Sequence, residues 1–280
     1  MNFLTVNSTT PEASTNSTTH FSVFISVQIC LFSINILFGL PTHSYIIWLI
    51  LTGTRSGIAS GYFNLNLSVC EIVNCINCMI DIIRFWFPNL PMSTMFLYGL
   101  GITGRPLFQC LICVERYLAV VHPVTFLNFK PLRYRVICST AVWIIWFGSC
   151  LCNMFILASK NLYAQTWFLL MQILPILSIQ LFCLSAVLRA LKQSGPGERG
   201  REREEENRMK RRAFYLILIT TVNMVIIYVP LIISGLVLLL TPQFLLAPRA
   251  TSVICYVLAG FVQPVLYLHR AGKFSCLCSS

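Results

Sequence analysis

The 280-residue sequence has too little charge for a water-soluble protein of its length. Asp and Glu together number nine, charged residues make up 10% of the chain, and hydrophobic residues make up 56%. Soluble domains usually contain about 25% charged residues, so this composition excludes a compact domain surrounded by water. The mean hydropathy of +0.75 indicates an integral membrane protein instead.

The sequence also lacks the patterns that carry catalysis. Its four histidines are scattered, and it has no His-Glu-x-x-His, no Gly-x-Ser-x-Gly and no glycine-rich loop before a Lys. We therefore expect no enzymatic activity and no cofactor.

Thirteen cysteines suggest a metal or disulfide protein at first sight. The pairs Cys75–Cys78 and Cys110–Cys113 both have Cys-x-x-Cys spacing. All four lie in apolar stretches, where Cys acts as a small apolar side chain, so we expect no metal site. A structural zinc is the alternative interpretation.

Uncharged stretches predict membrane helices. Five stretches carry no charge: residues 21–54, 136–159, 161–188, 213–248 and 250–268. Each has about the 20 residues that a spanning helix needs. Two further apolar stretches, 61–87 and 92–120, contain a few charged residues. Because backbone groups in hydrocarbon must bond within their own segment, we predict an all-α membrane protein, a seven-transmembrane helix bundle.

Basic residues predict the direction of the bundle. With the N-terminus outside, sixteen of the twenty Lys and Arg residues lie on the inner side, and only Lys160 and Arg249 lie outside. The positive-inside rule therefore predicts an outer N-terminus and an inner C-terminus. The predicted parts are an extracellular tail (1–20), a seven-helix domain (21–268) with a third inner loop at about 190–212, and a cytoplasmic tail (269–280).

Both tails carry candidate modification sites. Asn7-Ser-Thr and Asn16-Ser-Thr are glycosylation sequons on the side predicted to be outside. Cys276 and Cys278 follow the last span and are candidates for palmitoylation. The net charge of +11 is mostly on the inner side, which favours contact with anionic lipid and an intracellular partner over nucleic acid.

The strongest local pattern is Glu115-Arg116-Tyr117 at the inner end of the third span. Further motifs follow in chain order: Leu67 to Glu71, Trp143, Pro175, Tyr228-Val-Pro230 and Gln263-Pro264-Val-Leu-Tyr267. Together with seven spans in the expected direction, this set resembles the rhodopsin-like (class A) G-protein-coupled receptors over about residues 22–278.

The resemblance implies a multi-pass receptor of the plasma membrane, which transmits an unidentified extracellular ligand to a heterotrimeric G protein. By that resemblance Glu115 holds Arg116 at rest, and Arg116 meets the G protein after activation. The implied switch comprises Glu115, Arg116, Tyr117, Tyr228, Pro230, Gln263, Pro264 and Tyr267. Taken alone, Arg116 also fits a snorkelling residue at the membrane interface.

Several features depart from the family. No Cys occurs from residue 79 to 109 or from 153 to 182, so the usual disulfide between span three and the second outer loop cannot form. His43, Tyr228 and Gln263 stand where the family usually has Asn, Trp and Asn. The inner end of span six lacks the acid that some members use to hold the motif arginine, so we expect a weakly held resting state with basal activity.

Two charges are expected deep in the membrane, where charge is costly and usually functional. Glu71 follows Gly61 by ten residues and Arg105 precedes Arg116 by eleven, which places both about 15–16 Å above the inner face. By the resemblance, an acid at the place of Glu71 commonly helps to hold sodium. We expect the guanidinium of Arg105 to replace that ion. The alternative is an unpaired Arg105 in a water-filled cavity.

The outer half of the predicted bundle gives less information about a ligand. Asp81 and Arg84 are three residues apart on one helix, so they either pair, which we favour, or leave Arg84 for an anionic ligand. Further pocket candidates are Tyr98, Trp167, Gln172 and Tyr256. Aromatic residues at outer helix ends also form the interface belt.

Two other functions fit parts of the sequence. A transporter would have repeated halves, and this sequence shows no internal repeat. A receptor-like protein that does not couple, such as a scavenger or dimer partner, stays open because spans six and seven differ from the family.

Overall fold

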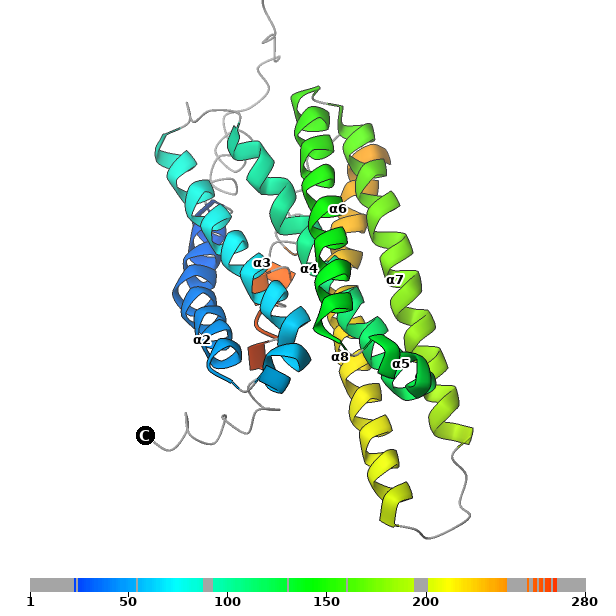
Figure 1. Cartoon of the computed structure of the whole chain (residues 1–280). Coiled ribbons are helices and arrows are strands. Elements are labelled where there is room, and N and C mark those ends of the chain that lie inside the picture. The colour runs from blue at the N-terminus through cyan, green and yellow to red at the C-terminus, as the bar shows by residue number, and fades with distance from the viewer. Residues whose placement is uncertain are drawn as a thin grey trace, which may run out of the picture.

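Every secondary-structure element that the structure describes is helical (Figure 1). The computed structural model describes residues 23, 25–53, 55–87, 93–129, 131–159, 161–193, 201–240 and, near the C-terminus, 251, 254–255, 257–258, 260–262 and 264–265. Residues 25–34 are helical and lead into the first labelled element. The elements are η1 (Asn35–Gly39), α2 (Leu40–Leu51), α3 (Arg55–Trp86), α4 (Ser93–Val121), α5 (Pro123–Phe129), α6 (Leu132–Ala158), α7 (Leu162–Gln193) and α8 (Arg201–Leu240).

Five helices of the described chain are long and apolar enough to cross a membrane. Their spans are Ile25–Leu51, Gly61–Trp86, Leu132–Ile156, Tyr163–Lys192 and Lys210–Val237. Each coincides with a stretch predicted from the sequence. Helix α4 matches the predicted stretch 92–120, and the described residues between 251 and 265 belong to the predicted seventh stretch.

Large apolar side chains are exposed on several of these helices. Phe38, Ile144, Phe155 and Met171 each have at least 61% of their surface exposed. A water-soluble protein rarely exposes so much apolar surface, whereas a membrane helix directs such side chains into lipid. The exposure pattern therefore agrees with a membrane bundle.

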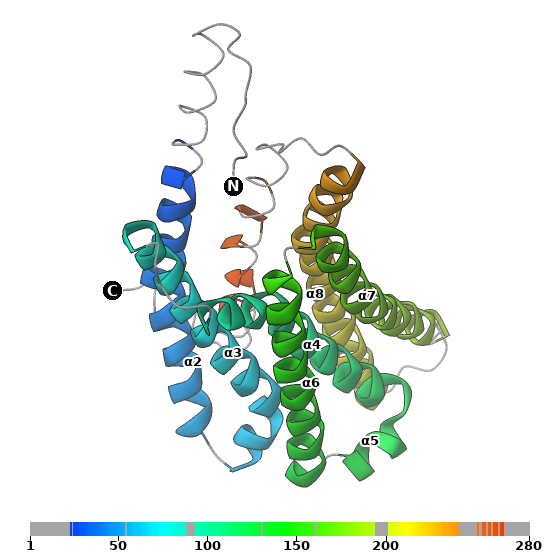
Figure 2. The same cartoon turned by 90° about the horizontal axis from the view of Figure 1, so that it is seen from above.

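Helix α4 is the centre of the molecule. It contacts α3, α5, α6, α7 and α8, and Figure 2 shows it between α2 and α3 on one side and α7 and α8 on the other. One apolar cluster joins it to α3 and α6 through Phe108, Leu67 and Trp146. A second joins it to α7 and α8 through Cys110, Ile173 and Met224, so side chains of α4 meet both halves of the bundle.

Small residues allow the helices to approach closely. A Cβ atom on Gly104 of α4 would lie 2.5 Å from Sγ of Cys70 on α3 and 2.7 Å from Cε2 of Trp146 on α6. Membrane helices commonly use small residues in this way, because close backbones gain van der Waals contact. Gly104 therefore fixes the spacing of three helices.

The first span contains a π-helical turn at Asn35–Gly39. Pro41 follows this turn and has no N–H to donate, and a wider turn is one way for a helix to accommodate such a residue. The side-chain amide of Asn35 donates to Sγ of Cys78 at 3.4 Å, and Sγ of Cys75 donates to the carbonyl of Asn35 at 3.6 Å. The π-turn thus ties the first span to α3.

Helices continue into the predicted third inner loop. Helix α7 ends at Gln193 and α8 begins at Arg201, so much of the stretch 190–212 is helical. Helix α8 has 40 residues, or about 60 Å at 1.5 Å per residue, which is about twice the thickness of bilayer hydrocarbon. Its charged first turns are therefore expected to extend beyond the hydrocarbon. Figure 1 shows this end of α8 reaching past the neighbouring ends of α3 and α6.

Candidate functional site

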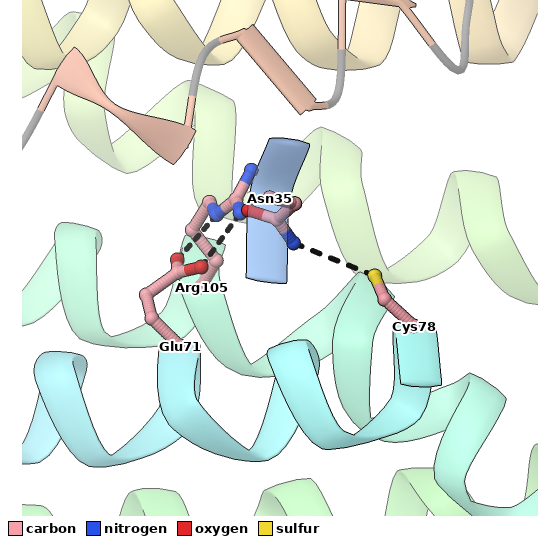
Figure 3. Close-up of polar contacts among 4 residues, drawn as sticks. All are labelled: Asn35, Glu71, Cys78 and Arg105. Atoms are coloured by element: carbon pink, nitrogen blue, oxygen red, sulfur yellow. Dashed lines mark hydrogen bonds and ion pairs between the residues drawn. The ribbon is translucent and has the colours of Figure 1, made fainter. Parts of the chain in front are cut away.

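Glu71 of α3 and Arg105 of α4 form a two-point salt bridge inside the bundle (Figure 3). Nε of Arg105 lies 2.5 Å from Oε1 of Glu71, and Nη2 lies 2.7 Å from Oε2. The two side chains are 2% and 6% exposed. Both carboxylate oxygens therefore accept from the guanidinium, in contrast to the alternative of an unpaired arginine in a water-filled cavity.

A glycine of the C-terminal segment makes room for this pair. A Cβ atom on Gly260 would lie 3.0 Å from Nη2 of Arg105. His43 of α2 is buried and close enough to Glu71 and Arg105 to interact with both electrostatically. The pair consequently lies where α2, α3, α4 and the predicted seventh span meet.

These contacts do not suit a sodium ion. Both oxygens of Glu71 are already bonded to Arg105, and a second cation beside the guanidinium would be repelled by its charge. The arginine instead supplies the positive charge from the chain itself, in a planar two-point geometry that a carboxylate favours.

A second charged group lies at the inner end of α4. Oε1 of Glu115 is 2.6 Å from Nη2 of Arg135 on α6, whereas Oε2 of Glu115 is 3.8 Å from Nη2 of Arg116. The side chains of Glu115 and Arg135 are each 8% exposed, and that of Arg116 is 18% exposed. The structure thus brings Glu115 and Arg116 near each other but gives Glu115 a closer partner.

Sequence reasoning missed Arg135. It belongs to a basic group with Lys130 and Arg133, which the positive-inside rule assigns to the inner surface without separating its members. The structure shows how α6 is rotated about its axis, and this orientation buries Arg135 and exposes Arg133.

Tyr117 joins α4 to α7 and to the linker before α5 at the same end of the bundle. Its hydroxyl is 3.1 Å from Nε2 of His122, between α4 and α5. Its ring packs edge-on against Phe182 of α7, with ring centroids 5.7 Å apart. Tyr117 therefore helps to hold α7 and the linker that leads into α5 against the end of α4.

Switch residues on α8 are part of the packed core. Tyr228 is 1% exposed and lies in the cluster with Cys110, Ile173 and Met224. Pro230 is inside α8, and Pro264 is buried.

Several sequence predictions lie outside the described residues: Gln263, Tyr267, Asn7, Asn16, Cys276, Cys278, Tyr256 and the side chain of Tyr98.

The predicted pocket residues are mostly near the surface. Arg84 Nη1 is 3.9 Å from Oδ1 of Asp81, and the two side chains are 30% and 17% exposed. A pair with this exposure contributes at most about 0.5 kcal/mol. Trp167 is 58% exposed, which fits the interface belt better than a pocket. Gln172 is partly exposed on α7.

The buried cysteines behave as small side chains. Cys75, Cys78, Cys110 and Cys113 are buried and have free thiols. Within the described residues, no group of three or more His, Cys, Asp or Glu side chains could hold a metal ion.

Gln180 is the basis of a stability prediction. It is fully buried on α7, and neither amide atom has a hydrogen-bond partner within the described residues. Unpaired buried polar groups cost about 1–3 kcal/mol each. We expect Gln180→Leu to raise the Tm of the purified protein by roughly 2–4 °C, measured beside Gln172→Leu, which should change little. A lower Tm for Gln180→Leu alone would contradict the unpaired amide.

Comparison with known proteins identifies relatives. Human hydroxycarboxylic acid receptor 2 is 26% identical over 220 residues, which cover 70% of this chain and 58% of that receptor. The rat protein of the same name is 27% identical over 216 residues, with 69% and 58% coverage. Human C-C chemokine receptor type 4 is 24% identical over 194 residues, with 58% and 52% coverage.

The chain spans little more than half the length of the relatives it matches. No protein-family model matches it. The relatives are receptors rather than enzymes, and the similarity extends over much of the chain. With its apolar helices packed around α4, this chain is a membrane protein homologous to the rhodopsin-like (class A) G-protein-coupled receptors, whose architecture is a seven-helix bundle.

Proposed function

We propose that the chain is a plasma-membrane receptor, with its N-terminus outside and its C-terminus inside, that activates a heterotrimeric G protein. One observation carries the proposal: the Glu115-Arg116-Tyr117 group lies at the end of α4 where α6, α7 and, through Phe214 and Ile217, α8 also meet. A cytoplasmic partner at this end would contact four helices at once. Movement of any of them would change the surface that it binds.

The mechanism requires two arrangements of the bundle. An extracellular ligand shifts the population toward the active arrangement only if it binds that arrangement more tightly. Pro230 interrupts the hydrogen-bond ladder of α8 near the packed Tyr228, which makes this point a suitable hinge. Motion of the part of α8 between Pro230 and the cytoplasm would open the inner end of the bundle and release Arg116 toward the G protein.

Hydroxycarboxylic acids are the first ligand class to screen. The name of the relatives identifies that class for those receptors. In this chain, Arg84 has a partly exposed guanidinium that is only loosely paired with Asp81, so an anionic ligand at the outer end of α3 would find a donor there. Chemokines, the class named for other relatives, are the second choice.

The proposed coupling predicts ligand-independent signalling that depends on Arg116. We expect cells that express the chain to show basal activation of at least one G-protein class, and Arg116→Ala to remove most of it. The loss is expected because the guanidinium is the group proposed to contact the G protein.

The measurement is G-protein activation for each class at matched surface levels. Gly148→Ala on α6 is the control, because a Cβ atom added there meets nothing within 4 Å. Equal signal from the native chain and Arg116→Ala would contradict the role of Arg116. A non-coupling, receptor-like protein would then become the better interpretation, since no ligand-free signal would depend on the motif.

A further inference from the structure

A single carboxylate lies between two arginines at the inner end of α4. Glu115 makes a short contact of 2.6 Å with Arg135 through Oε1. Its other oxygen is 3.8 Å from Arg116, beyond hydrogen-bonding distance. Arg135 is therefore the main partner of the Glu115 carboxylate, because it is closer than Arg116 and is as buried as Glu115 itself.

Arg116 is correspondingly weakly held. Its Nε atom is buried and has no hydrogen-bond partner within the described part of the chain. The three charged side chains together carry a net charge of +1, so the two arginines repel each other across the shared carboxylate. Both facts favour a displaced Arg116 over one fixed to Glu115.

Arg135 is buried where it makes this contact. On the first turns of α6, Arg133 and Tyr134 are exposed, whereas Arg135 is 7% exposed. A buried guanidinium is retained only where it is paired, because an unpaired one is costly to desolvate. Glu115 provides that pairing, so the bond links the end of α4 to α6.

We propose that Arg135 is a positioning residue that draws Glu115 away from Arg116 and thereby raises ligand-independent coupling. This inference rests on the proposed receptor function. It assigns the expected weak resting state to a specific competitor on α6, in addition to the lack of an acid in the basic stretch 208–212 of α8.

The test compares Arg135→Gln with Arg133→Gln, an exposed neighbour on the same helix. We expect Arg135→Gln to lower basal G-protein activation about two- to fivefold, because Glu115 then binds Arg116. Arg133→Gln should leave the signal unchanged, and Arg135→Lys should restore it in part. Unchanged or higher signal in Arg135→Gln, or a silent native chain at verified surface level, would overturn the proposal.

A second measurement is independent of signalling. Thermal unfolding of purified Glu115→Gln, Arg135→Gln and the double variant should show that the double variant loses no more Tm than the worse single variant. Additive losses would show that the pair does not form and would overturn the inference. Loss of signal in Arg116→Ala with no effect of Arg135→Gln would overturn this inference alone, whereas signal unaffected by Arg116→Ala would overturn the proposed switch.

Discussion

Arg105→Met is expected to destabilise the protein strongly. It leaves Glu71 as a carboxylate that is 6% exposed and has lost both guanidinium contacts. Removal of one partner of a buried pair typically costs about 3–5 kcal/mol, because the remaining charge is uncompensated. A large part of the total stability of a typical domain would be lost. We expect little protein at the cell surface and a strongly lowered Tm in detergent.

Arg84→Met is the matched control for this prediction. It removes the same type of side chain from a partly exposed pair with a 3.9 Å separation. Such a pair contributes little, so surface level and Tm should stay near those of the native chain. Equal effects of the two substitutions would contradict the special role of the internal pair.

The second large effect is expected for Gly104→Ala. The added Cβ would lie 2.5 Å from Sγ of Cys70 and 2.7 Å from Trp146, distances that force the helices apart. Overpacking usually costs about 1–3 kcal/mol, and helix propensity returns only about 1 kcal/mol. Because contacts enclose Gly104 from α3 and α6 at once, we expect the upper end of that range and a Tm lower by about 5 °C or more.

Gly148→Ala on α6 is the control, because an added Cβ there meets nothing within 4 Å. It should leave the Tm unchanged or raise it slightly through helix propensity. Thermal unfolding of both variants in the same detergent is the measurement. A Gly104→Ala variant as stable as Gly148→Ala would contradict the close approach of α3, α4 and α6.

The positions of the spans could be predicted because hydrocarbon imposes a simple rule. Stretches without charge must be helical and about 20 residues long to cross it, and five of the helices have the required length and apolarity. The depth of Glu71 and Arg105 followed from residue counts along straight helices. Such counts give the depth of a residue in the membrane but not the direction in which its side chain points.

The direction in which a side chain points around its helix axis could not be predicted from the sequence. Arg133 and Arg135 are two residues apart and therefore point about 200° away from each other on a helix, yet sequence alone does not say which one faces α4. The resemblance accordingly paired Glu115 with Arg116, its neighbour in sequence, while the closest arginine came from α6. The π-turn at Asn35–Gly39 likewise has no strong sequence signal.

The internal pair has a structural cost and a structural benefit. Burying two charges is costly, and an apolar pair of similar volume is often as stable. The benefit is that α3 and α4 are joined in one register by two directional bonds, beside Gly260 of the C-terminal segment. An internal arginine is also always present, whereas a bound ion depends on its concentration.

Glu71 and Arg105 are expected to stabilise each other directly. A double-mutant cycle of thermal unfolding with Glu71→Gln, Arg105→Met and the double variant tests this expectation. We predict that the double variant is more stable than the sum of the single losses allows, with an interaction energy of about 2 kcal/mol or more. Additive losses would contradict the account, because they would show that the two buried charges do not depend on each other.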